Sequence, residues 1–349
     1  MSDAPAVDTE YLREILNRPE GQAVTRTQIT EVADSNTARV IKAAVWIEAD
    51  GDTCVRKLFI KTAKRDRAEN TYHEMSMKEG MFYKFIRENP VDGLPVPKCY
   101  DAYVSNEAGE FVIVLEDMSD HYSAPDDTAL ADNNTWFSCA KSLARFHAGF
   151  WNHEAIDPAD AQTEEELEAE ALSLRERLRS FLDDFAAEFD EKIKTTLNRA
   201  MDINIQSIKE TSGRIRNRNN VTICNGDSHI RNFLLPTEAN GGPLIVDFQF
   251  WGEGIGAGDL AHLTRVSFSD ELKREVQIPL VRRYYDTLLA CGVTGYTWED
   301  CWRDYRMYAA TMALIPFFQY TYFGLRYDEW NGALKELVYN YELLGCDEL

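Results

Sequence analysis

The sequence predicts an α+β protein in which a small antiparallel sheet comes first and a larger helical part follows. Residues 23–62 alternate apolar and polar side chains, as half-buried strands do. Most of the chain after residue 130 instead shows the three- and four-residue spacing of amphipathic helices. A chain of 349 residues is also long enough for two parts with a core each, and too long for one small domain.

The first part divides into three expected strands, at residues 23–32, 39–49 and 54–62. The connection between the first two contains no glycine, so it matches neither a Walker loop nor a glycine-rich nucleotide loop. Its backbone amides, with the hydroxyls of Ser35 and Thr37, could contact phosphate. An ordinary hairpin turn fits this connection equally well.

A lysine ends the third strand. Lys61 follows the apolar run Leu58-Phe59-Ile60, and Lys57 and Lys64 lie close to it in the sequence. Any one of these lysines could simply be a solvated charge at the edge of a sheet.

A helix with two candidate partners for that lysine is predicted at residues 70–88. Its apolar side chains recur at helical spacing, at Met77, Met81, Phe82 and Phe85. Glu79 and Glu74 both lie on this helix, and the sequence leaves the choice between them open.

The crossing between the two parts is expected at about residues 115–119. The apolar strand 111–115 runs into Glu116-Asp117-Met118 and then a polar stretch that continues to residue 132. The sequence therefore predicts a first part at residues 1–117 and a second at 118–349.

The next predicted helix carries apolar residues at Trp136, Ala140, Leu143 and Phe150, and Asp132 and Asn133 are its possible caps. His147 lies among these apolar residues, as a hydrogen-bonded core histidine would.

Residues 221–249 hold the most specific pattern in the chain. A short apolar strand, 221–224, is followed by the turn residues Asn225-Gly226-Asp227 and by Asn232. A second strand at 233–235 and the Asn-Gly pair of residues 240–241 predict a hairpin that returns to Asp247. We therefore expect Asp227, Asn232 and Asp247 to converge.

Converging carboxylate and amide oxygens suit Mg²⁺, which prefers oxygen ligands and shares its shell with substrate phosphates. A second carboxylate that is not bound to the metal can then align or accept a hydroxyl proton, as in phosphoryl transfer. Each of these residues by itself could equally be a turn former or a strand-end cap. Their joint spacing favours the chemical interpretation.

This run resembles the aminoglycoside phosphotransferase and choline kinase group of small-molecule kinases, which carry His-Gly-Asp, four residues and Asn, followed by an Asp-Phe-Glu or Asp-Phe-Gln triplet. The Asp247-Phe248-Gln249 version, with Asp259-Leu260-Ala261 after it, looks closest to the ecdysteroid-kinase-like and choline-kinase-like branch. The resemblance covers roughly residues 25–265. It implies a bilobal, protein-kinase-like fold and an ATP- and Mg²⁺-dependent kinase that phosphorylates a hydroxyl group of a small molecule.

The resemblance also implies roles for single residues. Asp227 would be the catalytic base, and Asn232 and Asp247 would hold Mg²⁺. Lys61 would reach the α- and β-phosphates, with Glu79 holding it. Glu116 and Met118 would pair with adenine through their backbone groups.

Two positions near the expected base need comment. Asn225 stands where the family usually has a histidine that braces the loop, so we expect an altered but working loop. His229 lies two residues beyond Asp227, where several related kinases carry a histidine near the transferring phosphate. A phosphate or substrate role and a purely structural hydrogen bond both remain open for His229.

Two other functions compete with this interpretation. A kinase-like protein that binds nucleotide without turnover is compatible with Asn225 and with the glycine-free connection. The glycines at 252, 254, 256 and 258 imitate a dinucleotide-binding turn, which would suit an NAD-type oxidoreductase. A dinucleotide-binding unit needs a further parallel strand after the helix, and residues 260–349 predict none.

Charge and composition narrow the class of partners. With 37 basic and 59 acidic residues, the net charge of −22 disfavours a nucleic-acid partner. The acidic residues concentrate at 157–191, as on an exposed helical face, and Arg214, Arg216 and Arg218 predict a solvated loop.

The sequence has seven cysteines without a pairing pattern, no signal peptide and no membrane span. We therefore expect free thiols in a cytoplasmic protein.

The acceptor and the oligomeric state stay open at this stage. The last hundred residues are rich in aromatic side chains, with Asp304, Asp328 and Glu329 near them. Such a set could hold an amine by cation–π contact and charge, and it could equally be core packing. A small-molecule alcohol is the expected substrate class.

Overall fold

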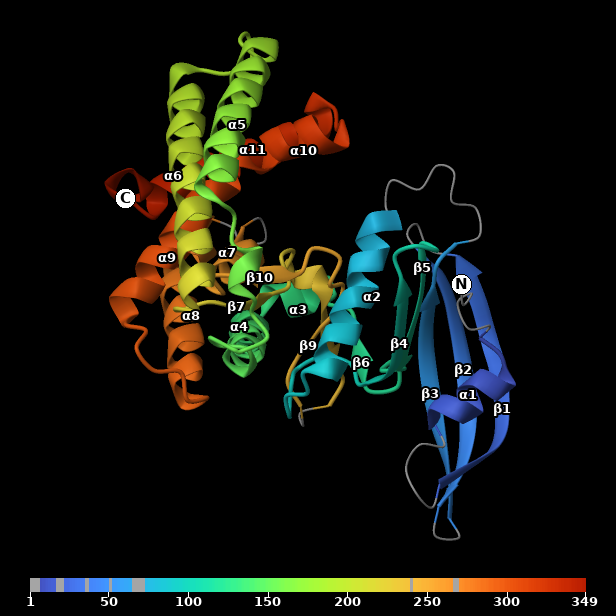
Figure 1. Cartoon of the computed structure of the whole chain (residues 1–349). Coiled ribbons are helices and arrows are strands. Elements are labelled where there is room, and N and C mark those ends of the chain that lie inside the picture. The colour runs from blue at the N-terminus through green and yellow to red at the C-terminus, as the bar shows by residue number, and fades with distance from the viewer. Residues whose placement is uncertain are drawn as a thin grey trace. The chain divides into compact units, whose positions relative to one another are not determined.

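The computed structural model of the chain describes residues 7–16, 22–34, 38–49, 52–64, 73–238, 241–265 and 270–349. The chain forms two compact units, drawn in Figure 1. The first unit contains Met1–Ala124 and Leu234–Trp251, and the second contains Pro125–Phe233 and Gly252–Leu349. The chain therefore passes from one unit to the other at three places. The sequence-based division into residues 1–117 and 118–349 stays a prediction.

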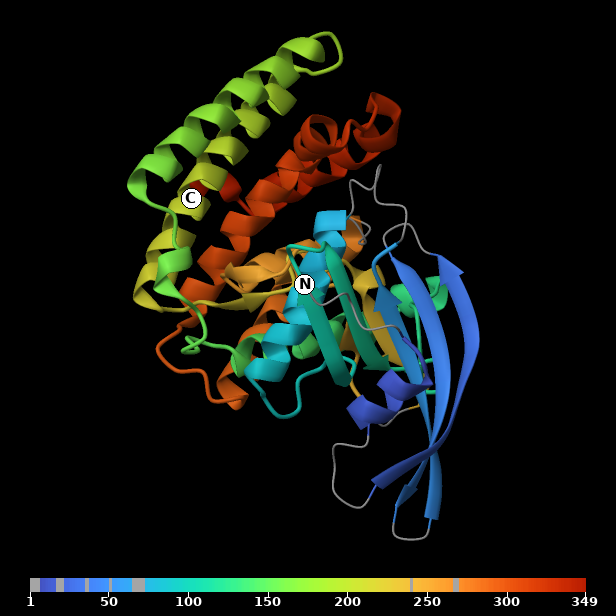
Figure 2. The same cartoon turned by 45° about the vertical axis from the view of Figure 1, so that its right-hand side comes forward.

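The first unit is built on a five-stranded sheet whose paired strands are all antiparallel (Figure 2). The spatial order is β1-β2-β3-β5-β4. The bounds of the strands are Gln22–Asp34 for β1, Arg39–Ala49 for β2, Asp52–Thr62 for β3, Cys99–Ser105 for β4 and Glu110–Glu116 for β5. The three expected N-terminal strands and the strand at 111–115 are confirmed, and β4 was not expected.

Two helices pack against this sheet. Helix α1 (Thr9–Leu16) buries three apolar residues in a core that also holds alternate residues of β2, β3 and β5. Helix α2 (His73–Glu88) packs on β4 and β5. Gly80 permits this close approach, because a Cβ atom there would lie 2.9 Å from Cγ2 of Val104.

The returning segment of the first unit forms a small sheet with the order β6-β8-β9. Its strands are β6 (Tyr122–Ser123), β8 (Phe233–Pro236) and β9 (Leu244–Ile245). The strand expected at 233–235 and the one that leads to Asp247 are both present. Residues 239–240 of the expected turn lie outside the described residues.

The second unit is mainly helical, as expected for the chain after residue 130. Asp132 caps α4 through its carboxylate, which accepts a hydrogen bond from the backbone N–H of Asn134 at 2.9 Å. The α-helices of this unit are α3 (Asp127–Ala131), α4 (Asn133–Gly149), α5 (Glu164–Asp184), α6 (Glu191–Asn217), α7 (Ala257–Thr264), α8 (Asp270–Ala290), α9 (Trp298–Thr311), α10 (Ile315–Phe323) and α11 (Tyr327–Leu343). The α+β class predicted from the sequence is therefore confirmed.

The acidic run lies on α5, which runs beside α6 in both views (Figures 1 and 2). A capping box formed by Thr163 and Glu166 begins this helix. Its apolar stripe is buried and its glutamates face solvent, so the expected exposed acidic face is confirmed. The buried residues are Leu167, Leu174, Leu178 and Phe181.

The glycine-rich segment does not form a dinucleotide-binding unit. Strand β10 (Gly252–Gly254) pairs antiparallel with β7 (Thr222–Cys224), and the described residues beyond it contain helices but no further strand. The NAD-type alternative therefore lacks its parallel strand. Gly256 instead permits close packing, since a Cβ atom there would lie 2.6 Å from Nδ1 of His147 and 2.5 Å from the hydroxyl of Tyr284.

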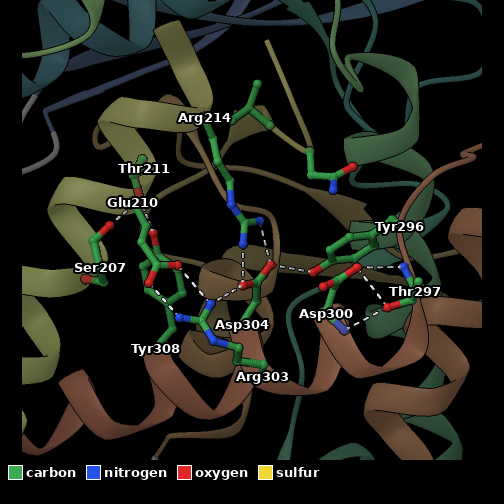
Figure 3. Close-up of polar contacts among 12 residues, drawn as sticks. Ser207, Glu210, Thr211, Arg214, Tyr296, Thr297, Asp300, Arg303, Asp304 and Tyr308 are labelled. Carbon is green, nitrogen blue, oxygen red and sulfur yellow. Dashed lines mark hydrogen bonds and ion pairs between the residues drawn. The ribbon is translucent and has the colours of Figure 1, made fainter. Parts of the chain in front are cut away.

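A buried ion pair joins α6 to α9 (Figure 3). The guanidinium of Arg214 donates two hydrogen bonds of 2.7 Å to the two carboxylate oxygens of Asp304, which is completely buried. The Tyr296 hydroxyl donates a third, at 2.9 Å. The expectation of a solvated arginine loop was wrong, because Arg214 and Arg216 lie in the last turns of α6 and Arg218 caps the helix.

Two expectations about the whole chain can also be compared with the structure. All seven cysteines are free thiols, as expected. Within the described ranges, no helix combines the length and the apolar character that crossing a membrane requires.

Replacing Asp304 by Ala should destabilise the second unit by about 3–5 kcal/mol, because it leaves the Arg214 guanidinium largely buried without its counter-charge. Urea unfolding followed by tryptophan fluorescence measures this loss. The matched control is Asp202→Ala, which removes an ion pair with Arg175 in which both side chains are about half exposed. That change should cost no more than about 1 kcal/mol. Equal losses in the two variants would contradict the assignment.

Candidate functional site

A buried ion pair joins β3 to α2 in the first unit. The ammonium of Lys61 donates to both carboxylate oxygens of Glu79, at 2.8 and 2.9 Å. Burial by itself lowers the pKa of Lys61, but the charge and hydrogen bond of Glu79 and the charge of Asp247 outweigh it and raise the pKa above its usual value. Lys61 therefore stays charged at neutral pH.

The alternatives that the sequence left open are placed differently. Lys57 lies on the exposed side of β3 and pairs with Asp120 at 2.7 Å, with both side chains about half exposed. Glu74 is exposed on α2, whereas the side chain of Glu79 is 3% exposed. The structure therefore pairs Lys61 with Glu79.

Asp247 belongs to the same unit and is held there by aromatic packing on α2. The ring of Phe248 stacks on that of Phe82 with a centroid distance of 3.6 Å and an interplanar angle of 4°. The indole N–H of Trp251 donates to the carbonyl of Lys78 at 2.8 Å. Asp247 itself has a φ of 61°, a backbone conformation that non-glycine residues rarely adopt and that recurs at functional sites.

The expected nucleotide contacts lie at and beyond the end of β5. Glu116 is exposed, and its backbone N–H donates to the carbonyl of Lys98 at 2.9 Å. The carbonyl of Met118 accepts from the N–H groups of His121 and Tyr122. Ser35 and Thr37, the other expected contacts, lie outside the described residues.

In the second unit, a tight loop after β7 presents Asp227. Gly226 has a φ of 83°, in the left-handed region that glycine adopts without strain. The buried side chain of Asn225 braces the turn, because its Oδ1 accepts from the Asp227 N–H and from the Ser228 hydroxyl, both at 3.2 Å. Asn225 thus supplies loop-bracing hydrogen bonds at the position where we expected a brace.

The loop is anchored by Asp259, in the first turn of α7. Its carboxylate accepts the backbone N–H groups of Asn225 at 2.6 Å and Gly226 at 2.9 Å, and it lies 3.1 Å from Nε2 of His147. Burial would raise the pKa of Asp259, but His147 and the two backbone donors outweigh it and lower the pKa. Asp259 is therefore ionised, so Nε2 of His147 donates to it, and Nδ1 of His147 lies 2.8 Å from the Tyr284 hydroxyl. The expected core role of His147 is confirmed.

Three nitrogen-bearing side chains surround the carboxylate of Asp227. Nε2 of His229 lies 3.5 Å from Oδ2, while Nδ1 of His262 and Nη2 of Arg265 lie 3.4 and 3.6 Å from Oδ1. These separations are too long for strong hydrogen bonds. The side chain of Asp227 is 27% exposed, so it can meet a ligand.

The loop also fixes Asn232. Its side-chain amide donates to the carbonyl of Asp227 at 2.8 Å, and its backbone N–H donates to the carbonyl of His229 at 2.8 Å. This orientation assigns the amide nitrogen to the loop and leaves Oδ1 as the atom that suits a hard cation.

These residues form two groups, each described within its own unit. The first unit brings Lys61, Glu79 and Asp247 together, and the second brings Asp227, His229 and Asn232 together. The sequence reasoning assigned no role to His262 and Arg265, which come next to this loop from α7. The available signal was their spacing: His262 follows Asp259 by three residues and Arg265 follows His262 by three, and residues three apart lie side by side on a helix.

Comparison with known proteins supplies the family. The sequence profile of the ecdysteroid kinase-like family matches residues 33–292, which is more than half of the chain. The chain belongs to the ecdysteroid kinase-like family. It is therefore a member of a family of kinase-like small-molecule phosphotransferases, and the resemblance inferred from residues 224–263 is confirmed. No curated protein matches the sequence.

A solved structure shows the fold of this ecdysteroid kinase-like protein. A Ralstonia eutropha JMP134 protein that carries a provisional aminoglycoside phosphotransferase name matches with a TM-score of 0.57 and 15% identity, over 97% of this chain and 98% of that chain. The choline kinase of Cryptosporidium parvum Iowa II gives a TM-score of 0.47 and 10% identity, over 98% and 96%. The first match establishes the protein-kinase-like fold that the sequence predicted.

A cluster of the buried His147 and Asp259 and the half-buried Cys224 brings three possible metal ligands within 4.8 Å of one another. In this family member, however, Nε2 of His147 and both oxygens of Asp259 are already engaged in direct hydrogen bonds. Burial also raises the pKa of the Cys224 thiol well above its usual value, which disfavours a thiolate ligand. We therefore assign the cluster to bracing the loop.

Replacing Asp259 by Asn should loosen the loop that carries Asp227, because an amide nitrogen would then face backbone N–H donors. We expect the amide protons of Asn225 and Gly226 to exchange faster with solvent, as measured by hydrogen–deuterium exchange and NMR. Asp300→Asn is the control, since Asp300 caps α9 at an exposed position. Unchanged protection at both amides in Asp259→Asn would refute the anchoring role.

Replacing Lys61 by Met should cost about 3–5 kcal/mol of stability, because it leaves the Glu79 carboxylate buried without a partner. Combining it with Glu79→Leu should recover most of that loss, as measured by urea unfolding. If Lys61 also binds phosphate, nucleotide should bind more weakly than to the wild type in both the single and the double variant, although the double variant recovers its stability. The control is Lys57→Met, which removes an exposed pair and should change stability by no more than about 1 kcal/mol.

Proposed function

We propose that this protein is an ATP- and Mg²⁺-dependent kinase that transfers a phosphoryl group to a hydroxyl of a small molecule. The observation that carries the proposal is the position and partial exposure of the Asp227 carboxylate. A braced and anchored loop presents this carboxylate, partly exposed and at 3.4–3.6 Å from its nearest charged or titratable neighbours. A carboxylate so placed can accept the proton of an acceptor hydroxyl.

The other residues divide the remaining tasks in this proposal. Lys61, held by Glu79, contacts the α- and β-phosphates, and backbone groups of Glu116 and Met118 pair with adenine. Among the hydrogen bonds of the described residues, the Met118 carbonyl accepts two and none uses the Met118 N–H. That N–H is therefore the adenine donor we propose. Ser35 and Thr37 are proposed as further phosphate contacts.

His229 is proposed as a hydrogen-bond donor to the transferring phosphate. Burial lowers the pKa of its imidazole, and the positive charges of Arg265 and Arg231 add to this effect against the opposing charge of Asp227. His229 is therefore neutral at pH 7 and acts as a donor without adding a charge.

The residues proposed for Mg²⁺ fit its chemistry. Asn232 offers an amide oxygen, and Asp247 offers a carboxylate on a backbone held at positive φ. Both are hard oxygen ligands, and few protein ligands are needed because Mg²⁺ keeps waters and phosphate oxygens in its shell. When bound, the metal would neutralise phosphate charge during transfer.

Supporting observations favour turnover over the alternative of a binder without activity. That alternative was based partly on Asn225 standing in place of the usual histidine. Because Asn225 itself forms the bracing hydrogen bonds of the loop, this replacement does not argue against activity. The proposed base, the Lys61–Glu79 pair and the proposed metal ligands are all present in the chain. The expected cytoplasmic location and the oligomeric state stay open.

The test is incubation of the purified protein with Mg·ATP and a pooled library of small alcohols and amines, followed by mass spectrometry. We expect one or more members to gain about 80 Da, the mass of a phosphoryl group. Asp227→Ala should lower the rate by at least about 10²-fold, since it removes the general base, while nucleotide binding persists. Phosphorylation at the wild-type rate in Asp227→Ala would remove the assigned base.

Two negative outcomes have separate meanings. If no library member is phosphorylated but Mg·ATP binds tightly, the binder without activity becomes the better description. If nucleotide does not bind, the kinase proposal itself is overturned.

A further inference from the structure

Arg265 lies at the end of α7 beside Asp227 and is loosely held. Its Nη1 lies 3.2 Å from Nδ1 of His262, and its Nη2 lies 3.6 Å from the Asp227 carboxylate. Its Nε is buried and has no hydrogen-bond partner among the described residues. The side chain is 18% exposed, so this charged guanidinium is largely removed from water. Several of its N–H groups nevertheless have only long contacts or no hydrogen-bond partner among the described residues.

Arg214 of the same unit shows how a structural arginine is accommodated here. It is about equally exposed, at 19%, and its two terminal nitrogens donate to both oxygens of Asp304 at 2.7 Å. Arg265 makes no such two-point contact with Asp227. A partly buried guanidinium placed in this way has N–H donors that can pair with oxygen atoms of a ligand.

The nitrogen-bearing side chains around Asp227 lie on two sides of its carboxylate. His229 lies at Oδ2, while His262 and Arg265 lie at Oδ1. His229 is the residue proposed to face the transferring phosphate, so Oδ1 is the side left for the acceptor. Because Nδ1 of His262 lies at hydrogen-bond distance from the Arg265 guanidinium, which can only donate, this ring nitrogen is the acceptor and Nε2 of His262 carries the proton. The donors on this side are therefore the N–H groups of Arg265, which suit oxygen acceptors.

Each acidic residue that could bind an amine already has an arginine partner, buried for Asp304 and exposed for Asp328 and Glu329. Asp304 forms an ion pair with Arg214, and Asp328 and Glu329 both form ion pairs with Arg326, at 3.1 and 3.6 Å. Among the aromatic residues near them, Tyr305, Phe317 and Trp330 are buried in the core. The described part of the second unit thus supplies an unsatisfied cation near the base, whereas the anions proposed for an amine are paired.

We propose that Arg265, assisted by His262, binds the acceptor and selects hydroxyl compounds that carry a carboxylate over those that carry an ammonium. The inference rests on the proposed role of Asp227 as the base. A carboxylate matches the planar fork of a guanidinium, and its single charge balances the single charge of Arg265. A phosphate dianion would leave excess negative charge beside Asp227.

The experiment uses three probes with the same three-carbon skeleton and a terminal hydroxyl: 3-hydroxypropionate, 1,3-propanediol and 3-aminopropan-1-ol. Their binding to the full chain is measured by calorimetry in the presence of Mg·ADP, so that no turnover is required. We expect the acid to bind at least about tenfold more tightly than the amine, with the diol between them. Arg265→Gln should reduce this ratio to within about twofold.

Two further variants separate recognition from folding. Arg265→Lys keeps the charge and loses the fork, so it should bind the acid more weakly than the wild type while still preferring it to the amine. Arg231→Gln removes an exposed arginine of the Asp227 loop and should leave the ratio unchanged. Preservation of the ratio in Arg265→Gln, tighter binding of the amine, or absence of acid binding would each overturn the inference.

This test is independent of the test of kinase activity. A protein that phosphorylates only amino alcohols in the library assay would keep the proposed function and overturn the selection by Arg265. A protein that binds the acid through Arg265 and phosphorylates nothing would lose the proposed function while keeping the anion-binding role of Arg265.

Discussion

The loop that carries Asp227 depends on one buried carboxylate. Asp259 takes the N–H groups of Asn225 and Gly226, which would otherwise be buried donors at the sharpest part of the turn. His147 and Tyr284 complete the network from α4 and α8, and Gly256 leaves room for both. The geometry of the expected base is therefore set by helices that are distant from it in the sequence.

The two units place their charges by the same physical rule. In each, a buried carboxylate is paired with a basic side chain at hydrogen-bond distance, Glu79 with Lys61 and Asp304 with Arg214. Arg265 departs from this rule, because its nearest carboxylate is held at 3.6 Å. Buried pairs with short, two-point contacts stabilise the fold, and an incompletely paired charge at a partly exposed position is better explained by a ligand.

Local patterns predicted much of this architecture. Alternation identified β1, β2 and β3, and a continuous apolar run identified β5. Helical spacing identified α2 and α4, and the residue pattern at 224–249 identified the family. Contacts between distant segments were harder to predict. Nothing local indicates that Arg214 reaches Asp304, ninety residues away, or that Trp251 reaches the carbonyl of Lys78. The choice between Glu79 and Glu74 likewise required knowing which face of α2 meets the sheet.

The distribution of cysteines has a practical consequence. Cys54, in the first unit, and Cys291, in the second, are the two exposed thiols. Burial raises the pKa of Cys99, Cys301 and Cys346 to about 12 and raises that of Cys139 and Cys224 well above its usual value, so these five react slowly with electrophiles. The natural chain therefore offers one labelling position in each unit, and a pair of spectroscopic probes attached there would report the separation of the units as nucleotide is added.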